Sequence, residues 1–167
     1  RTNLLTYSEN FDNAAWAKVR SSIIPNSTIA PDGTLTASKL VEDTSTNTHV
    51  LEQTATISSG VTYTLSVYVK AAERTSTLVQ MFLGSSNGVA VNLTNGAIIT
   101  TSDANNSVIS VGNGWYRISK TFTSTVTGTG YFDVFPYDGA TATYTGNGNS
   151  GIYIWGTQLE VGTFPTS

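Results

Sequence analysis

The sequence lacks cysteine altogether and contains a single histidine, His49. Disulfide bonds, thiolate metal sites and a cysteine nucleophile are therefore excluded, and zinc has almost none of its usual ligands. Long apolar runs are also missing, because no stretch approaches the roughly 20 residues that cross a bilayer as a helix. We therefore expect no membrane insertion.

Charge is scarce as well: 11% of the residues are charged, the net charge is −3, and no basic stripe occurs. Nucleic-acid-binding proteins neutralise phosphates with clustered Lys and Arg, so we expect no nucleic-acid partner. The chain is instead rich in Thr, Ser, Asn and Gly, with 3 Trp, 8 Tyr and 6 Phe. Many aromatic rings with few charges suit a neutral, hydroxyl-rich ligand better than an ionic one.

Catalytic chemistry has few groups to use. A Ser-His-Asp arrangement would need His49, which we expect to be exposed where a loop enters a strand, and no G-x-S-x-G elbow surrounds a serine. Glycoside hydrolysis needs two facing carboxylates, whereas the acids here are scattered and Glu52 and Asp133 form no evident pair in the sequence. We therefore expect that the protein is not an enzyme. The alternative is an enzyme whose catalytic acid pair is assembled from residues that are distant in the sequence.

Alternation with a period of two dominates the chain. In Val61–Ala71, apolar residues at odd positions face one way and mostly polar ones face the other, as in a half-buried strand. The other predicted strands are Trp115–Thr125, Ile152–Val161, Leu78–Leu83, Val108–Val111, Tyr131–Phe135, Ser38–Glu42 and Val50–Thr56. Turn signals such as Asn87-Gly88 recur about every ten residues, which is typical of sandwiches and barrels. We predict one all-β domain spanning 1–167, with a helical turn only in Asn10–Val19.

Five segments, taken in order, resemble carbohydrate-binding-module-like domains of phage tail proteins and bacterial polysaccharide-degrading enzymes. They are Asn3–Asp12 leading to Trp16, Ala30–Thr34 followed by Ala37–Leu40, Gly60–Ala71, Gly112–Arg117 and Gly151–Glu160. The resemblance implies a jelly-roll β-sandwich of two antiparallel sheets, with sugar bound on the concave sheet or at the loop edge. It also implies a structural calcium ion near paired terminal strands.

The resemblance further implies a domain that is covalently part of a larger phage or secreted bacterial polypeptide. The chain begins at Arg1 without a signal segment, so we expect it to come from a longer precursor. Such a domain would be extracellular or virion-associated and could be oligomeric through its parent.

Sugar recognition combines an aromatic face with hydrogen-bonding side chains. By alternation, the polar residues of Val61–Ala71 share one strand face, and those of Trp115–Thr125 share another. Tyr131, Asp133, Phe135 and Tyr137 share the face of a third strand. If these strands are neighbours in the concave sheet, they form one platform. The predicted carbohydrate-binding residues are Tyr68, Lys70, Gln80, Trp115, Arg117, Asp133 and Tyr137.

Tyr68 is the leading single candidate, because the core face of its strand is filled without it. The alternatives are that these tyrosines pack within the fold and that Arg117 and Asp133 form a salt bridge with each other. We expect Trp16 and Trp155 to serve mainly in packing.

For calcium, the predicted ligands are Glu9, Asp12 and Glu160, the acids nearest the two termini. Because no dense calcium-loop motif occurs, exposed loop carboxylates are the alternative. The sequence thus predicts a non-catalytic carbohydrate-binding domain that attaches a larger protein to a polysaccharide or glycan-coated surface. The alternative is a structural or assembly domain of a virion tail or surface appendage, without its own ligand.

Overall fold

The computed structural model describes residues 1–101 and 103–166, and every regular element within these ranges is a strand. The strands are β1 (Ala17–Val19), β2 (Ser21–Thr28), β3 (Ala37–Glu42), β4 (Thr46–Thr48), β5 (Val50–Ile57), β6 (Thr62–Ala71), β7 (Ser76–Leu83), β8 (Ser85–Asn92), β9 (Ile98–Thr101), β10 (Asn106–Gly112), β11 (Trp115–Thr123), β12 (Gly128–Tyr137), β13 (Thr143–Thr145) and β14 (Gly151–Val161). Nothing in the described ranges forms a helix able to cross a bilayer. The all-β prediction is confirmed.

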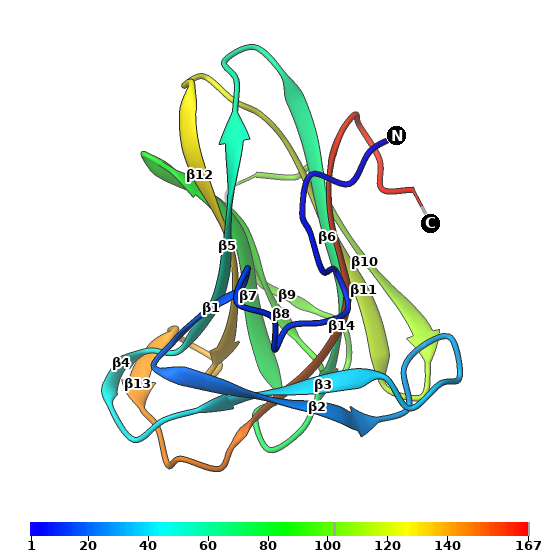
Figure 1. The fold of residues 1–167 in the computed structure, drawn as a ribbon, viewed down its shortest axis with the longest axis vertical. Coiled ribbons are helices and arrows are strands. Elements are labelled where there is room, and N and C mark those ends of the chain that lie inside the picture. The colour runs from blue at the N-terminus through cyan, green and yellow to red at the C-terminus, as the bar shows by residue number, and fades with distance from the viewer. Residues whose placement is uncertain (102, 167) are drawn as a thin grey trace.

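The strands form two six-stranded antiparallel sheets that face each other (Figure 1). The first sheet has the order β1-β5-β12-β7-β8-β9, and the second has the order β10-β11-β6-β14-β3-β2. Chain neighbours such as β5 and β6, β6 and β7, and β11 and β12 lie in opposite sheets, so the chain crosses repeatedly between the two layers. A small two-stranded sheet of β4 and β13 flanks one end.

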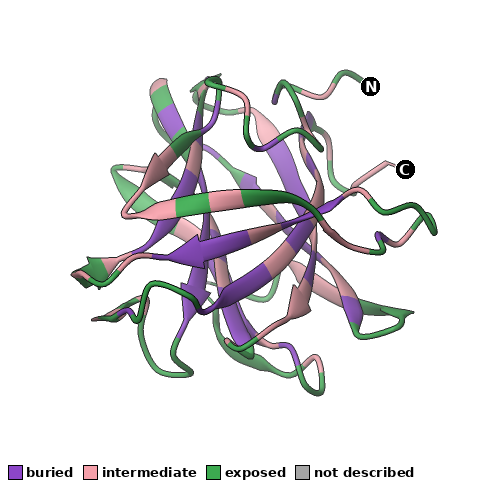
Figure 2. Ribbon diagram, turned by 60° about the horizontal axis from the view of Figure 1, so that its bottom comes forward, coloured by how far each residue is buried: buried purple, intermediate pink, exposed green. Residues whose placement is uncertain are grey.

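The core lies between the two sheets. On β6 the inward set predicted from alternation, including Tyr63, Leu65 and Val67, is buried, and on β12 Phe132 and Val134 are fully buried. Buried stretches in Figure 2 accordingly follow the strands, whereas exposed residues gather in the connecting loops. Apolar side chains on alternate positions thus drive the two sheets together.

All eight predicted strands occur, with ends shifted by no more than a few residues. Asn87-Gly88, which predicts a turn, instead lies inside β8, where Gly88 pairs with Gln80. The expected helical turn in Asn10–Val19 is also wrong. Asn13 N–H donates to the carbonyl of Asn10 and Trp16 N–H to that of Asn13, so successive turns lead directly into β1.

His49 is fully buried rather than exposed. Its Nδ1 lies 2.9 Å from the carbonyl oxygen of Arg20 and its Nε2 lies 3.2 Å from that of Tyr144, so the ring ties β4 and β13 to the end of the sandwich. The sequence missed this because the polar stretch around His49 resembles a solvated loop, while the contacts that cover the ring come from residues far away in the chain.

Candidate functional site

The structure divides the seven predicted carbohydrate-binding residues between the two sheets. In the second sheet β11 pairs with β6, and the register sets Arg117 opposite Tyr68 and Trp115 opposite Lys70. Gln80, Asp133 and Tyr137 lie on β7 and β12 of the first sheet. The condition for a single platform is therefore not met, and Arg117 and Asp133 are too widely separated to form the alternative salt bridge.

The outer surface of β11, β6 and β14, here called the β11–β6–β14 face, is largely a packing layer. Trp115 is 1% exposed, and its Nε1 donates to the carbonyl of Ile29 at 3.0 Å. It packs with Ala30 and Ala37, and Tyr68, Tyr153 and Trp155 contact this cluster. The Tyr68 ring meets Trp155 edge-on at 5.4 Å and lies beneath the Arg117 guanidinium at 5.3 Å. The packing role expected for Trp155 is confirmed.

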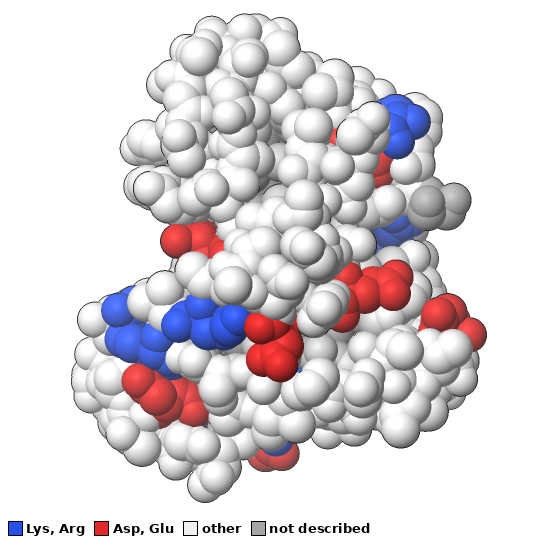
Figure 3. All heavy atoms as spheres, viewed as in Figure 1, with Lys and Arg blue, Asp and Glu red and all other residues white. Residues whose placement is uncertain are grey.

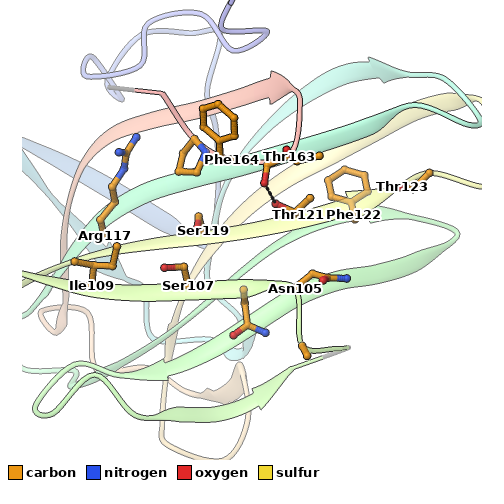
Figure 4. Close-up of a pocket in the computed structure, with 13 residues that line it drawn as sticks. Asn105, Ser107, Ile109, Arg117, Ser119, Thr121, Phe122, Thr123, Thr163 and Phe164 are labelled. Atoms are coloured by element: carbon orange, nitrogen blue, oxygen red, sulfur yellow. Dashed lines mark hydrogen bonds between the residues drawn. The ribbon is translucent and has the colours of Figure 1, made fainter.

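An open trough lies beside this face, between β10, β11 and the C-terminal segment (Figure 4). It has a volume of about 530 Å³, and its lining includes Ile109, Arg117, Ser119, Thr121 and Phe164. Among residues 1–101 and 103–166, Arg117 is the only charged residue that lines it. Its guanidinium already donates to Gln158 Oε1 at 2.8 Å and to the carbonyl of Thr166. The guanidinium of Arg117 thus already has hydrogen-bond partners within the protein.

The outer surface of β5, β12 and β7, here called the β5–β12–β7 face, presents aromatic rings to solvent. Tyr131 on β12 lies directly opposite Phe82 on β7, and these residues are 39% and 43% exposed. Both alternate with inward core residues, Phe132 and Met81, so their outward orientation is set by the pleat. Two exposed aromatic residues on paired strands offer apolar ring faces, which are the elements that pack against a pyranose.

A polar row crosses the same face next to the aromatic pair. The register aligns Glu52, Asp133, Gln80 and Gly88 across four strands. Gln80 Nε2 donates to Asp133 Oδ2 at 2.9 Å, and Ser86 Oγ donates to Gln80 Oε1 at 2.6 Å. A Cβ at Gly88 would lie 2.9 Å from Gln80 Cβ, so glycine leaves the space that Gln80 occupies.

Glu52 and Asp133 form a carboxyl pair that the sequence did not indicate. They face each other in the register of β5 and β12. Burial raises the pKa of Asp133 to about 8; Glu52 adds to this rise, while the Gln80 hydrogen bond opposes it. Glycosidases hold their two carboxyls about 5 Å or more apart, on either side of the scissile bond. Glu52 and Asp133 are directly paired neighbours on one sheet face, so no sugar fits between their side chains.

The molecular outline is indented near β5 and β12. Figure 3 shows a notch in the molecular outline on the side where β5 and β12 lie in Figure 1, with acidic atoms in the notch. Tyr137, at the other end of β12, is 6% exposed and its hydroxyl donates to the carbonyl of Ala140 at 2.7 Å. Of the three predicted residues on this sheet, Gln80 and Asp133 therefore lie beside the aromatic pair, whereas Tyr137 packs at the edge.

The predicted calcium ligands are not gathered. Glu160 is buried, accepts hydrogen bonds from Thr166 N–H and Oγ1–H, and lies 3.8 Å from Arg1. Glu9 and Asp12 are exposed on the N-terminal segment. Within residues 1–101 and 103–166 no three Asp, Glu, His or Cys side chains form a metal-binding group. The three acids thus make no joint cluster, and a calcium ion held with other oxygen ligands stays a prediction.

Three residues of the β5–β12–β7 face were missing from the predicted set: Glu52, Phe82 and Tyr131. Alternation could have found two of them, because Phe82 shares its strand face with Gln80 and Tyr131 shares its face with Asp133. Glu52 could not be identified from alternation, because its pairing with Asp133 depends on which strand lies beside β12.

No known family model matches the sequence, and no curated protein matches it. The fold does match solved structures. The structure of TmCBM61 in complex with β-1,4-galactotriose has a TM-score of 0.59 at 12% identity, covering 97% of this chain and 100% of that one. The CBM22-1 xylan-binding domain from Paenibacillus barcinonensis Xyn10C has a TM-score of 0.52 at 9% identity, covering 96% and 94%.

The enzymatically active domain of bacteriophage CBA120 tailspike protein 4 has a TM-score of 0.58 at 15% identity. The match covers 95% of this chain but only 21% of the tailspike chain. These likenesses confirm the predicted carbohydrate-binding-module-like jelly-roll sandwich as the fold.

Proposed function

We propose that this chain is a non-catalytic carbohydrate-binding domain and that its glycan lies on the β5–β12–β7 face. The observation that carries the proposal is the exposed Tyr131–Phe82 pair, which lies beside the polar row of Glu52, Asp133 and Gln80. The rings supply a stacking surface and the row supplies hydrogen-bonding groups, which is the combination that sugars require. The fold likeness to galactotriose- and xylan-binding modules supports the same reading.

In this proposal the domain acts by proximity, as part of a larger phage or secreted bacterial protein outside the cell or on a virion. It would hold that protein against a polysaccharide or a glycan-coated surface. A shallow sheet face buries little ligand area, so we expect weak affinity at a single site. Several copies on one parent assembly would raise the overall affinity without any new contact.

Replacement of Tyr131 by alanine is expected to weaken glycan binding about tenfold to a hundredfold, because burying an aromatic ring contributes roughly 1.5–3 kcal/mol. The ring is outside the core, so the melting temperature should change by less than about 2 °C. A glycan array that includes galactans and xylans would identify the ligand, and affinity gel electrophoresis would then compare the variants.

Tyr68→Ala is the matched comparison, because it removes the same side chain from the opposite sheet. Tyr68 packs against Trp155 and beneath Arg117, so this variant should lower the melting temperature and leave binding intact. Binding lost in Tyr68→Ala and kept in Tyr131→Ala would move the site to the β11–β6–β14 face. A folded protein that binds no glycan in the array would favour the structural or assembly role.

A further inference from the structure

The Glu52–Asp133 pair lies in a place where two negative charges would repel each other strongly. Asp133 is 4% exposed, and its Oδ2 accepts the hydrogen bond from Gln80. Its Oδ1 is buried and has no hydrogen-bond partner among the residues that the structure describes. Glu52 is the residue directly opposite in the register, and its carboxyl raises the pKa of Asp133. A proton between the two carboxyls would satisfy Oδ1 and remove one of the two charges.

The strands packed around the pair bring no basic side chain toward it. On β7 the facing residue is Gln80, which is neutral, and on β8 it is Gly88. On β1 Ala17 faces Glu52, and the neighbouring Lys18 lies opposite Leu51, on the other face of the pleat. Lys18 Nζ donates to the carbonyls of Asp12 and Asn13.

On β12 itself, the titratable neighbours on the same face are the phenols of Tyr131 and Tyr137. The hydroxyl of Tyr137 is bonded to the carbonyl of Ala140. No cation is therefore provided by the surrounding strands to balance the pair, and a proton is the simplest way to do so.

We propose that Glu52 and Asp133 share one proton, and that this protonated pair is the hydrogen-bonding centre through which the face takes an uncharged glycan and releases it at alkaline pH. The inference rests on the proposed function and names its ligand class. With the proton held between the two carboxyls, Glu52 stays against Asp133, and an oxygen of Glu52, the more exposed of the two residues, accepts from sugar hydroxyls. The remaining negative charge of the pair, without a base beside it, repels uronic acids and other anionic sugars.

Proton loss has a definite consequence for binding. Once the shared proton leaves, two adjacent carboxylates repel each other, and Glu52, the more exposed of the two, turns away from the position in which it accepts from the sugar. The pKa of Asp133 at about 8 places this change just above neutral pH. Affinity for a neutral glycan should therefore fall as the pH rises through about 8.

Stability should respond to the same proton. An unfolded Asp has a pKa of about 3.9, so between about pH 4 and pH 8 the unfolded chain releases a proton that the folded chain keeps. The free energy of unfolding contributed by this site therefore falls as the pH rises across that window and is level above it. In Asp133→Asn an amide donates to Glu52 at every pH, so this dependence is absent.

Glycan affinity and melting temperature are measured across about pH 5 to pH 9.5 for the wild type, Asp133→Asn, Glu52→Gln and the control Glu73→Gln. The Glu73 side chain is 53% exposed, pairs with Lys39 and belongs to the loop between β6 and β7, outside the proposed site. For the wild type and the control, affinity for the neutral glycan found in the array should drop about tenfold, the loss typical of one charge-assisted hydrogen bond. For Asp133→Asn and Glu52→Gln, the affinity ratio between the two extremes of pH should stay within about twofold. The melting temperature of Asp133→Asn relative to the wild type should rise by about 3 °C or more between pH 5 and pH 8.

The two proposals fail in distinguishable ways. A wild-type protein that binds a neutral glycan equally at all these pH values, with a melting-temperature profile parallel to that of Asp133→Asn, would overturn proton sharing and leave the glycan site standing. Selective binding of an amine-bearing or acidic glycan would overturn the assigned ligand class. A pH-dependent melting difference without any glycan binding would support the shared proton and refute its role in sugar recognition.

Discussion

Replacement of Arg74 by alanine is expected to lower the free energy of unfolding by about 3 kcal/mol, because it leaves a buried carboxylate without its cation. Glu42 is 1% exposed and receives Arg74 Nε and Nη2, both at 2.7 Å. Tyr144 Oη–H and Asn147 N–H complete the set, each at 2.8 Å. Burial opposes ionisation of Glu42, but these hydrogen bonds outweigh it and lower its pKa.

The loss should be large because this one carboxylate joins three separate segments at the end of the sandwich. Glu42 ends β3, Arg74 lies between β6 and β7, and Tyr144 belongs to β13. The lowered pKa also fixes the direction of the pH dependence. Its contribution is complete above the unfolded pKa of Glu, about 4.3, and is lost as the pH falls through the lower folded value.

Glu73→Ala is the control. Glu73 is adjacent to Arg74 in the chain, and its ion pair has the same length as that of Glu42 and Arg74 but is exposed to solvent. Glu73 lies 2.7 Å from Lys39, but its side chain is 53% exposed, so its removal should cost less than about 1 kcal/mol. Urea unfolding at neutral pH and again near pH 4 measures both variants. Equal losses of unfolding free energy in Arg74→Ala and Glu73→Ala would show that the burial of Glu42 does not increase the cost of removing its cation.

Periodicity in the sequence was sufficient to locate individual strands. It did not indicate which strands lie next to each other in a sheet. In β6 and β12, strict alternation was enough to separate core residues from outward ones, because side chains on a strand must alternate between its faces. Whether β12 lies beside β6 or beside β5 is decided by the crossing of the chain between sheets, which leaves no local signal. For that reason Arg117 and Asp133 seemed able to meet, although they lie on opposite sheets.

The same reasoning explains what was missed at the candidate site. Glu52 is one polar residue among several in β5, and only the register of β5 on β12 makes it the partner of Asp133. Phe82 and Tyr131 belonged to faces that the alternation had already assigned. The sequence pattern does not separate an aromatic residue that is presented to solvent from one that packs within the fold. In the structure both rings are partly exposed.

The last prediction concerns Trp16, which belongs to the hydrophobic core although the segment that precedes β1 contains no regular structure. It is 1% exposed, which confirms its predicted packing role. Its ring meets Phe11 at 5.2 Å and Phe132 at 6.1 Å, both edge-on, and its Nε1 donates to the carbonyl of Tyr7 at 3.0 Å. Trp16→Ala should lower the free energy of unfolding by about 3–5 kcal/mol, because it removes buried area and leaves a cavity.

The consequence should extend to the β5–β12–β7 face, since Phe132 is the inward neighbour of Tyr131 and Asp133 on β12. With no ring behind Phe132, β12 loses the support that fixes these outward side chains, and glycan affinity should weaken along with stability. Trp16→Phe separates packing from hydrogen bonding: it keeps a ring in place and should cost about 1–2 kcal/mol for the lost donor. Urea unfolding and affinity electrophoresis test both variants. A Trp16→Ala protein within about 1 kcal/mol of the wild type would show that the N-terminal segment only covers the sandwich and does not support it.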